Sequence, residues 1–184
     1  MERLTQGPIL APCFPTVTSA FYHHAATSPN AIAIHDTSSS RRHITYGQLA
    51  NSSQALASRL QELGVQPNDR VPLVVKRSAE MIVGILGILS CGAQYVPLDG
   101  GVISDSTLHH VVRQSGGSPV VCLPSTESRV RQLCPKATTV PAAINTTRPE
   151  ATPASEVPVQ HIIDLATPDS GCYVIYTSGM FDLI

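Results

Sequence analysis

The residues best suited to chemistry lie near the C-terminal end, where an apolar run passes into Thr177, Ser178 and Gly179. The run before them, residues 173–176 (YVIY), has the composition of a buried strand. Glycine allows a positive φ there, so consecutive N–H groups can turn toward the oxygens of an anion. Ligands of open parallel sheets bind at the carboxyl ends of the strands. The three residues are therefore a candidate anion site, although the same pattern is more often an ordinary turn.

Other polar residues do not form a recognisable catalytic or metal-binding motif. The pairs His23-His24 and His109-His110 are adjacent on predicted helices, so the two rings of each pair point in different directions. Neither pair has a carboxylate or cysteine four residues on, and the sequence predicts no metal site. Lys76-Arg77 follows a predicted strand and is interpreted as a solvated pair. No Asp has a His and a Ser at the spacing of a hydrolase triad, so no catalytic residue is predicted.

The elements that must position the candidate site alternate between helix and strand. Helices are predicted, from apolar periodicity and capping residues, at 17–27, 46–63, 79–91, 105–115 and 125–133. Strands are predicted at 31–36, 43–45, 71–75, 94–98, 119–123, 138–140, 159–165 and 171–177. After an initial hairpin, each strand is followed by a helix with short connections. This order predicts an α/β fold with a parallel sheet and crossover helices.

Individual boundaries rest on named residues. Thr18 or Ser19 is the predicted cap of the first helix, and Ser78 that of the third. Gly64 follows the apolar stripe of the second helix, as a C-terminal cap does. The segment 171–177 is apolar on both faces, as a strand in the middle of a parallel sheet is. Few residues follow to cover it, so its outer edge and one face are expected to be exposed.

Composition excludes several classes of function. The 184 residues are 42% hydrophobic and 14% charged, with a net charge of −1, which describes a globular chain without an excess of basic residues. Binding to nucleic acid or to an anionic membrane is therefore not expected. The five cysteines are scattered and odd in number, and Cys91, Cys122 and Cys172 lie in apolar runs. A cytoplasmic, reducing location is expected.

Three segments carry a resemblance to a known family. They are residues 44–49 (ITYGQL), residues 88–99 (ILSCGAQYVPLD) and the terminal run YVIYTSG. In this order and spacing the chain resembles the adenylate-forming (AMP-binding) enzymes, most closely the N-terminal part of a nonribosomal peptide synthetase adenylation domain. The resemblance runs from about residue 16 to Gly179.

The resemblance implies a fold and a reaction. The fold would be the incomplete N-terminal subdomain of the adenylate-forming α/β fold, a partial parallel-sheet sandwich. Intact members use ATP and Mg²⁺ to activate an amino acid or carboxylic acid as its adenylate for secondary-metabolite peptide assembly. Thr177, Ser178 and Gly179 would then begin the loop that holds the ATP phosphates, and most of the other motif residues would be structural.

The chain departs from the family pattern at several positions. Gly100 stands where a proline is usual, Ser106 lies near an expected arginine and Gln114 near an expected aspartate. Residues 180–184 (MFDLI) lack the glycines and lysine with which the phosphate loop continues. The substrate pocket and the C-terminal domain of the family have no counterpart in these residues. We therefore expect a fragment truncated in the phosphate loop that does not catalyse the reaction alone and holds no cofactor by itself.

The expected organisation has three parts. Residues 1–15 form a loose arm, residues 16–179 form the partial adenylation domain with a proline-rich loop at about 135–158, and residues 180–184 form a divergent tail. The acid that a parent domain would activate is not readable from these residues.

Two alternatives remain open at this stage. The chain could be a non-catalytic module that docks on a complete synthetase, or one that self-associates through an exposed sheet edge. It could instead be an unrelated doubly wound nucleotide-binding domain, although no Gly-x-Gly-x-x-Gly follows the first strand.

Overall fold

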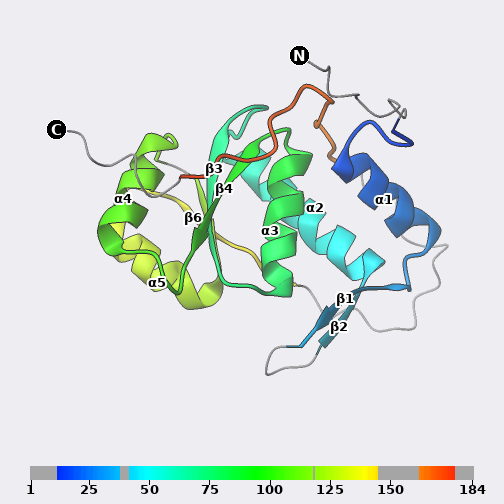
Figure 1. The fold of residues 1–184 in the computed structure, drawn as a ribbon, viewed down its shortest axis with the longest axis horizontal. Coiled ribbons are helices and arrows are strands. Elements are labelled where there is room, and N and C mark those ends of the chain that lie inside the picture. The colour runs from blue at the N-terminus through cyan, green and yellow to red at the C-terminus, as the bar shows by residue number, and fades with distance from the viewer. Residues whose placement is uncertain (1–11, 38–41, 118, 145–161, 177–184) are drawn as a thin grey trace, which may run out of the picture.

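The computed structural model describes residues 12–37, 42–117, 119–144 and 162–176, and these form a mixed α/β fold (Figure 1). Its helices are α1 Val17–Thr27, α2 Tyr46–Glu62, α3 Ala79–Ser90, α4 Asp105–Gln114 and α5 Pro124–Leu133. Its strands are β1 Ile32–Asp36, β2 Arg42–Thr45, β3 Arg70–Val75, β4 Gln94–Asp99, β5 Val120–Cys122 and β6 Thr139–Pro141. Each of these elements was predicted from the sequence, with bounds that agree to within one residue at each end.

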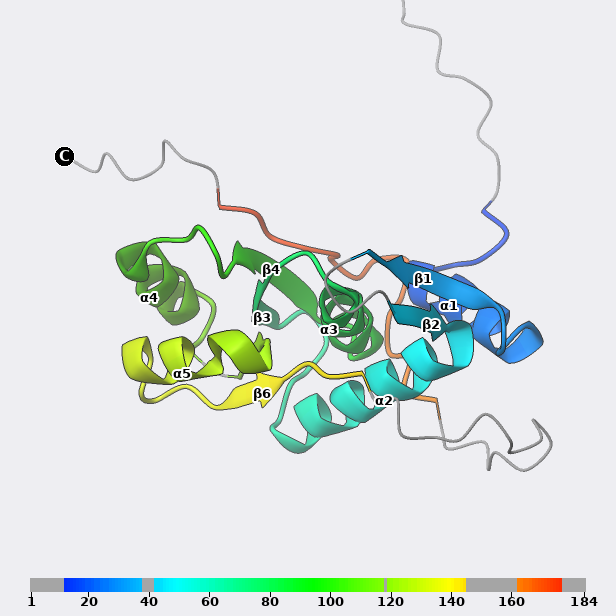
Figure 2. The same cartoon turned by 90° about the horizontal axis from the view of Figure 1, so that it is seen from below.

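The main sheet has the order β4-β3-β5-β6, and every pairing in it is parallel. Leu73 of β3 lies opposite Pro97 of β4 and Val121 of β5. Helices α2 and α3 cover one face of this sheet, and α4 and α5 cover the other (Figures 1 and 2). The predicted α/β class with a parallel sheet and crossover helices is confirmed.

The two faces of the sheet have separate cores because successive strand residues point to opposite sides. The α2–α3 face buries residues that include Val71, Leu73, Val75 and Val121. The α4–α5 face buries residues that include Val74, Val96, Leu98, Val120 and Cys122. Five of the six residues of β3 are buried, as expected for a strand with helices on both sides.

Capping residues define the ends of the helices. Thr45 caps α2 by accepting a hydrogen bond from the Gln48 N–H, and the Gln48 side chain accepts one from the Thr45 N–H. Gly64 follows α2 with a φ of +87°, a conformation that favours glycine. The predicted cap of α1 is wrong by two or three residues. Thr16 is the cap, because its hydroxyl accepts a hydrogen bond from the Ser19 N–H, and the Ser19 hydroxyl accepts one from the Thr16 N–H.

Glycines in α3 let this helix approach its neighbours closely. A Cβ on Gly84 would lie 2.5 Å from Cδ1 of Leu73 in β3, and a Cβ on Gly87 would lie 2.8 Å from Cδ2 of Leu56 in α2. The glycines therefore set the distances of α3 from the sheet and from α2.

Strands β1 and β2 form an antiparallel hairpin beside α2, as predicted. On its inner side Ile34 lies opposite the buried Ile44. Arg42 joins Asp36 at 3.0 Å and Glu80 of α3 at 2.7 Å. The hydrogen bonds to these two carboxylates raise the pKa of Arg42. This ion-pair network ties the hairpin to the N-terminal end of α3.

The segment 162–176 differs from its predicted form. Residues 162–165 belong to no strand, and residues 171–176 make a single parallel bridge, between Tyr173 and Tyr95 of β4. The segment lies at the β4 edge of the sheet, where Tyr173 and Ile175 are more than half exposed. The exposed outer edge agrees with the expectation for this strand, but its pairing with β4 is reduced to one bridge.

Candidate functional site

The carboxyl ends of β3, β4 and β5 lie at one edge of the sheet, which is where a parallel sheet binds ligands. The loop after β4 turns back over this edge. Gly100 N donates to Val75 O at 2.9 Å, and Gly101 N donates to Oδ1 of Asp99 at 2.8 Å. Asp99, which ends the second family-like segment, therefore shapes the turn, in agreement with its predicted structural role.

Arg129 of α5 fixes the rest of the β4–α4 loop. Its guanidinium donates to the carbonyl oxygen of Gly100 at 3.1 Å and to that of Ile103 at 2.6 Å. It also pairs with Asp105 at the start of α4, with Nε 2.9 Å from Oδ1. Sequence analysis missed this residue, because nothing in a spacing of 24 residues indicates that Arg129 and Asp105 meet.

We call residues 162–176 the tethered segment, because side chains from distant helices hold it. The Gln54 side-chain amide makes two hydrogen bonds to Ile163, donating to its carbonyl oxygen at 2.9 Å and accepting from its N–H at 2.7 Å. Thr18 donates to Oδ1 of Asp164 at 2.7 Å, and Leu165 N donates to Ser90 O at 2.7 Å. Helices α1, α2 and α3 each provide one of these tethers.

Beyond these tethers the segment turns and runs along β4, as its orange and red trace shows in both views (Figures 1 and 2). Tyr95 N donates to Cys172 O at 3.2 Å, and Val174 N donates to Tyr95 O at 3.1 Å. Gly171 allows the close approach, because a Cβ there would lie 2.6 Å from Cδ and Nε2 of Gln94 and would displace that side chain. The segment therefore runs parallel to β4, toward its carboxyl end.

The two sides of this final stretch have different surroundings. Val174 and Tyr176 pack against the core between the sheet and α4 and α5. Tyr173 and Ile175 are 53% and 57% exposed. The candidate anion residues Thr177, Ser178 and Gly179 follow directly in the sequence and lie outside the described residues.

One cation lies close to the candidate edge. Lys76 follows β3, is exposed, and has Cε 3.1 Å from the position of a Cβ on Gly101. Within the described residues the Lys76 ammonium forms no ion pair. Its exposed position agrees with the solvated role read from the sequence.

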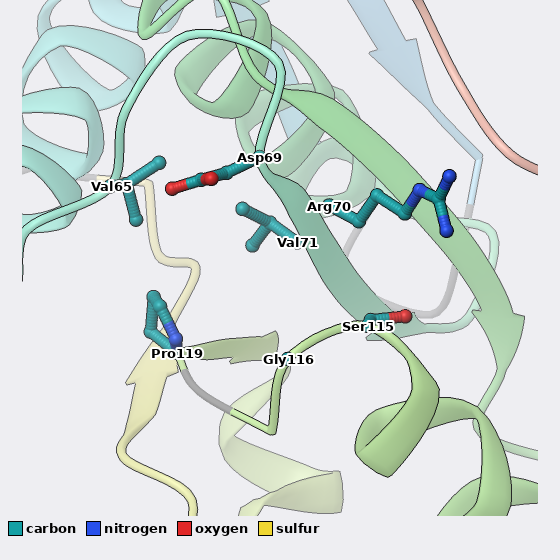
Figure 3. Close-up of a pocket in the computed structure, with 7 residues that line it drawn as sticks. All are labelled: Val65, Asp69, Arg70, Val71, Ser115, Gly116 and Pro119. Carbon is teal, nitrogen blue, oxygen red and sulfur yellow. The ribbon is translucent and has the colours of Figure 1, made fainter.

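The cavities of the described part lie elsewhere. A cavity of about 120 Å³ lies at the amino ends of the strands, lined by residues that include Val65, Asp69, Arg70 and Ser115 (Figure 3). The Ser115 hydroxyl is buried there and has no hydrogen-bond partner among the described residues. An apolar groove of about 470 Å³ lies between the start of α1 and the tethered segment. Neither cavity adjoins the carboxyl edge.

Metal ligands and membrane-spanning helices were also sought in the described residues. There, no group of three or more His, Cys, Asp or Glu side chains is arranged around one point. No helix in that part of the chain is long and apolar enough to cross a membrane.

All five cysteines are free. Cys91, Cys122 and Cys134 are buried, whereas Cys13 and Cys172 are exposed. Burial raises the pKa of Cys91 and of Cys122 to about 12. Cys172, which lies in an apolar run of the sequence, is exposed because the tethered segment lies at the edge of the sheet.

Comparison with protein families gives one match over most of the chain. The family described as AMP-binding enzyme matches residues 21–179, which includes both the tethered segment and the candidate anion residues. The chain belongs to the AMP-binding enzyme family. This membership confirms the resemblance found in the sequence and does not favour an unrelated nucleotide-binding domain.

Relatives in the AMP-binding family include much longer proteins. The chain is 35% identical over 166 residues to adenylate-forming reductase 03009 of Coprinopsis cinerea, covering 90% of this chain and 15% of the relative. It is 31% identical over 179 residues to the AMB antimetabolite synthetase AmbB of Pseudomonas aeruginosa, covering 97% of this chain and 13% of the relative. With bacitracin synthase 3 of Bacillus licheniformis the identity is 36% over 174 residues, covering 92% of this chain and 2% of the relative. The chain therefore spans about 15% or less of these relatives.

Solved structures give the same assignment of fold. The nonribosomal peptide synthetase FmoA3 in an AMPPNP-bound form aligns with a TM-score of 0.66 at 25% identity, over 88% of this chain and 16% of that one. The anthranilate CoA ligase AuaEII in complex with anthranoyl-AMP aligns with a TM-score of 0.69 at 17% identity, over 93% and 33%. At 17% identity, the likeness to AuaEII shows the fold alone. This chain thus corresponds to part of an adenylate-forming fold.

Proposed function

We propose that the chain is part of an adenylation domain that uses ATP to activate an amino acid or another carboxylic acid for peptide assembly. The observation that carries this proposal is the family match, which continues through the tethered segment to Gly179. Two relatives that support the assignment to peptide assembly are synthetases by name. If the chain were a docking module unrelated to catalysis, the family match through the phosphate loop would have no explanation.

In this proposal the tethered segment positions the phosphate loop. The last described residues run parallel to β4 toward its carboxyl end, where parallel sheets bind ligands, and this supports the assignment of Thr177, Ser178 and Gly179 as the phosphate-binding residues. Their hydroxyls and N–H groups bind the ATP phosphates, and Lys76 adds a positive charge from β3. The AMPPNP-bound relative FmoA3 supports a nucleotide as the ligand.

Magnesium is part of the same proposal, but its ligands are assigned to other regions. Among the described residues, Asp99 is the carboxylate that shapes the carboxyl edge, and it already accepts a hydrogen bond from Gly101 N. No metal-binding cluster lies near it in the described part. When bound, Mg²⁺ would neutralise phosphate charge, while this chain's own groups bind and orient the phosphates.

The proposed division of labour follows from the length that the chain covers. Residues 16–179 supply the scaffold with its proline-rich loop at about 135–158, and the rest of an adenylation domain supplies the acid pocket and the remaining catalytic groups. The 184-residue chain alone is then expected to give no ATP–pyrophosphate exchange with any amino acid.

A chimera tests this proposal. Residues 21–179 replace the corresponding residues in an adenylation domain of bacitracin synthase 3, which is 36% identical to this chain. We expect ATP–pyrophosphate exchange with the amino acid of the recipient domain. Thr177→Val with Ser178→Ala should lower the exchange rate by about tenfold to a hundredfold, because each removes a hydrogen bond to phosphate.

The matched control is Ser125→Ala, which removes a hydroxyl from the exposed side of α5. It should leave exchange unchanged. A folded chimera without exchange, or equal exchange in the doubly substituted and control chimeras, would overturn the proposal.

The proposed location is the cytoplasm. Three buried thiols without disulfide partners are compatible with a reducing compartment. Fractionation of cells that express the full-length gene product tests this: recovery in the secreted fraction would contradict it.

A further inference from the structure

We propose that His35 and His43 form a two-ligand site for a divalent transition-metal ion such as Zn²⁺. The two residues lie directly opposite each other on β1 and β2 of the hairpin. Their rings are in contact, with centroids 4.5 Å apart and planes at 81°. Neither residue belongs to a pattern that the sequence singled out, because the pairing depends on the register of the hairpin.

The separation of the rings fits two imidazoles bound to one ion. An imidazole nitrogen lies about 2.0–2.1 Å from bound Zn²⁺, and the ring centre lies about 1.1 Å further along the same line. Two rings that meet one ion at a right angle therefore have centres about 4.5 Å apart. The observed separation of the ring centres equals that of a bidentate site, and rotation of the two side chains brings one nitrogen of each ring to the ion.

The surroundings leave room for the ion and its other ligands. His35 and His43 are both exposed, on the face of the hairpin opposite the buried Ile44. The neighbouring pair, Asp36 and Arg42, points to the inner side, where Arg42 joins Glu80. Water can therefore complete the coordination shell, and the Arg42 guanidinium is held on the other face by its two carboxylates.

The hairpin also fixes the second ligand after the first has bound. Opposite positions in an antiparallel pair keep their side chains within reach of each other, which raises the effective concentration of the second imidazole. The ion bridges β1 and β2, so it stabilises the hairpin that leads into the capped start of α2. The hairpin is a sheet of its own and lies apart from the β4 edge in Figure 1, so the site is independent of the proposed nucleotide function.

The experiment uses the untagged 184-residue chain titrated with Zn²⁺ alone by calorimetry. The exposed thiols of Cys13 and Cys172 are first alkylated, since thiolates also bind Zn²⁺. We expect one equivalent to bind, and the imidazole resonances of His35 and His43 to shift together. His35→Thr and His43→Thr keep a strand-forming residue and should each weaken binding by on the order of tenfold or more.

The matched control is the other ring pair of the described part near the N-terminus, His23 and His24, whose centroids are 5.6 Å apart on one helix. The variant His23→Ala/His24→Ala should bind Zn²⁺ as the parent chain does. A rise in the melting temperature with Zn²⁺ should occur in the parent and the control but not in the His35→Thr and His43→Thr variants. Equal binding by all variants, or loss only in the control, would overturn the proposal.

Discussion

The unit from α2 to β4 and the tethered segment are neighbours in the structure but are held in different ways. In the α2–β4 unit, residues 46–99, apolar side chains close in sequence bury one another, and each helix has its own caps. The tethered segment has four exposed apolar side chains and depends on Gln54, Thr18 and Ser90 for its position. The first region is stabilised mainly by burial of apolar area, and the second mainly by hydrogen bonds to distant residues.

This difference has a consequence for the proposed function. The rigid α2–β4 unit positions the carboxyl edge, while the residues proposed to bind phosphate follow the less firmly packed region. Loops that bind ligands are commonly found on the less stable parts of a fold.

The largest effect is expected in the α2–β4 unit. Leu73→Ala removes a fully buried side chain and should lower the free energy of unfolding by about 2–5 kcal/mol. Gly84→Ala should cost about 1–3 kcal/mol, because its Cβ would lie 2.5 Å from Cδ1 of Leu73. In the double variant the new methyl occupies space that the leucine has left. The double variant should therefore lose less stability than the sum of the losses in the two single variants. Urea unfolding of the parent, the two single variants and the double variant measures these free energies. Strictly additive losses would show that Gly84 and Leu73 are not in contact.

A smaller and more local effect is expected in the tethered segment. Gln54→Leu leaves the Ile163 N–H and carbonyl without partners and should cost about 1–3 kcal/mol. Hydrogen exchange should become faster at Ile163 and Leu165, with little change in β3. Ser58→Ala, on the exposed side of the same helix, is the control and should change neither region. Equal acceleration in β3 would mean that the two regions unfold together.

Much of the α2–β4 unit could be predicted from the sequence because its signals are local. Ser78, Thr45 and Gly64 mark helix ends by their own chemistry, and the apolar runs of β3 and β4 reveal burial. The position of the tethered segment could not be predicted in this way. Its tethers join residues 109 and 146 positions apart, and an apolar edge strand has the same composition as a central one.

The candidate site was predicted only in part for the same reason. The sequence indicates Thr177, Ser178 and Gly179, but Lys76 and Arg129 reach the edge through the fold alone. Likewise, the contact of His35 with His43 depends on the strand register, which neither residue indicates.

The exposed edge gives a third prediction, with a second copy of the chain as the partner. Residues 171–176 carry no charge and no proline, so two edges can pair through their outward main-chain groups. Ile175→Lys places a charge on this edge and should reduce self-association at micromolar concentration, measured by light scattering. Val102→Lys, at a residue 83% exposed in the β4–α4 loop, is the control. A parent chain that is monomeric under these conditions would contradict the prediction.

The smallest effect concerns the buried thiols. Folding raises the pKa of Cys91 and Cys122 from 9.0 to about 12, so unfolding is favoured once the unfolded thiols can ionise. Their contribution to stability should be complete below pH 9.0 and lost as the pH rises toward about 12. At pH 8 in the native protein, iodoacetamide should modify the exposed Cys13 and Cys172 and leave Cys91 and Cys122 unmodified. Rapid modification of the buried pair would show that the core opens readily.

The central claim is that the tethered segment positions the phosphate loop, and ATP kinetics of the bacitracin synthase chimera test it most directly. Gln54→Leu in the chimera should raise the KM for ATP by about fivefold or more, because small displacements of positioned groups have large kinetic effects. The KM for the amino acid and the folded fraction should stay unchanged, and Ser58→Ala should behave as the parent. An unchanged KM for ATP, together with faster hydrogen exchange at Ile163, would contradict the claim.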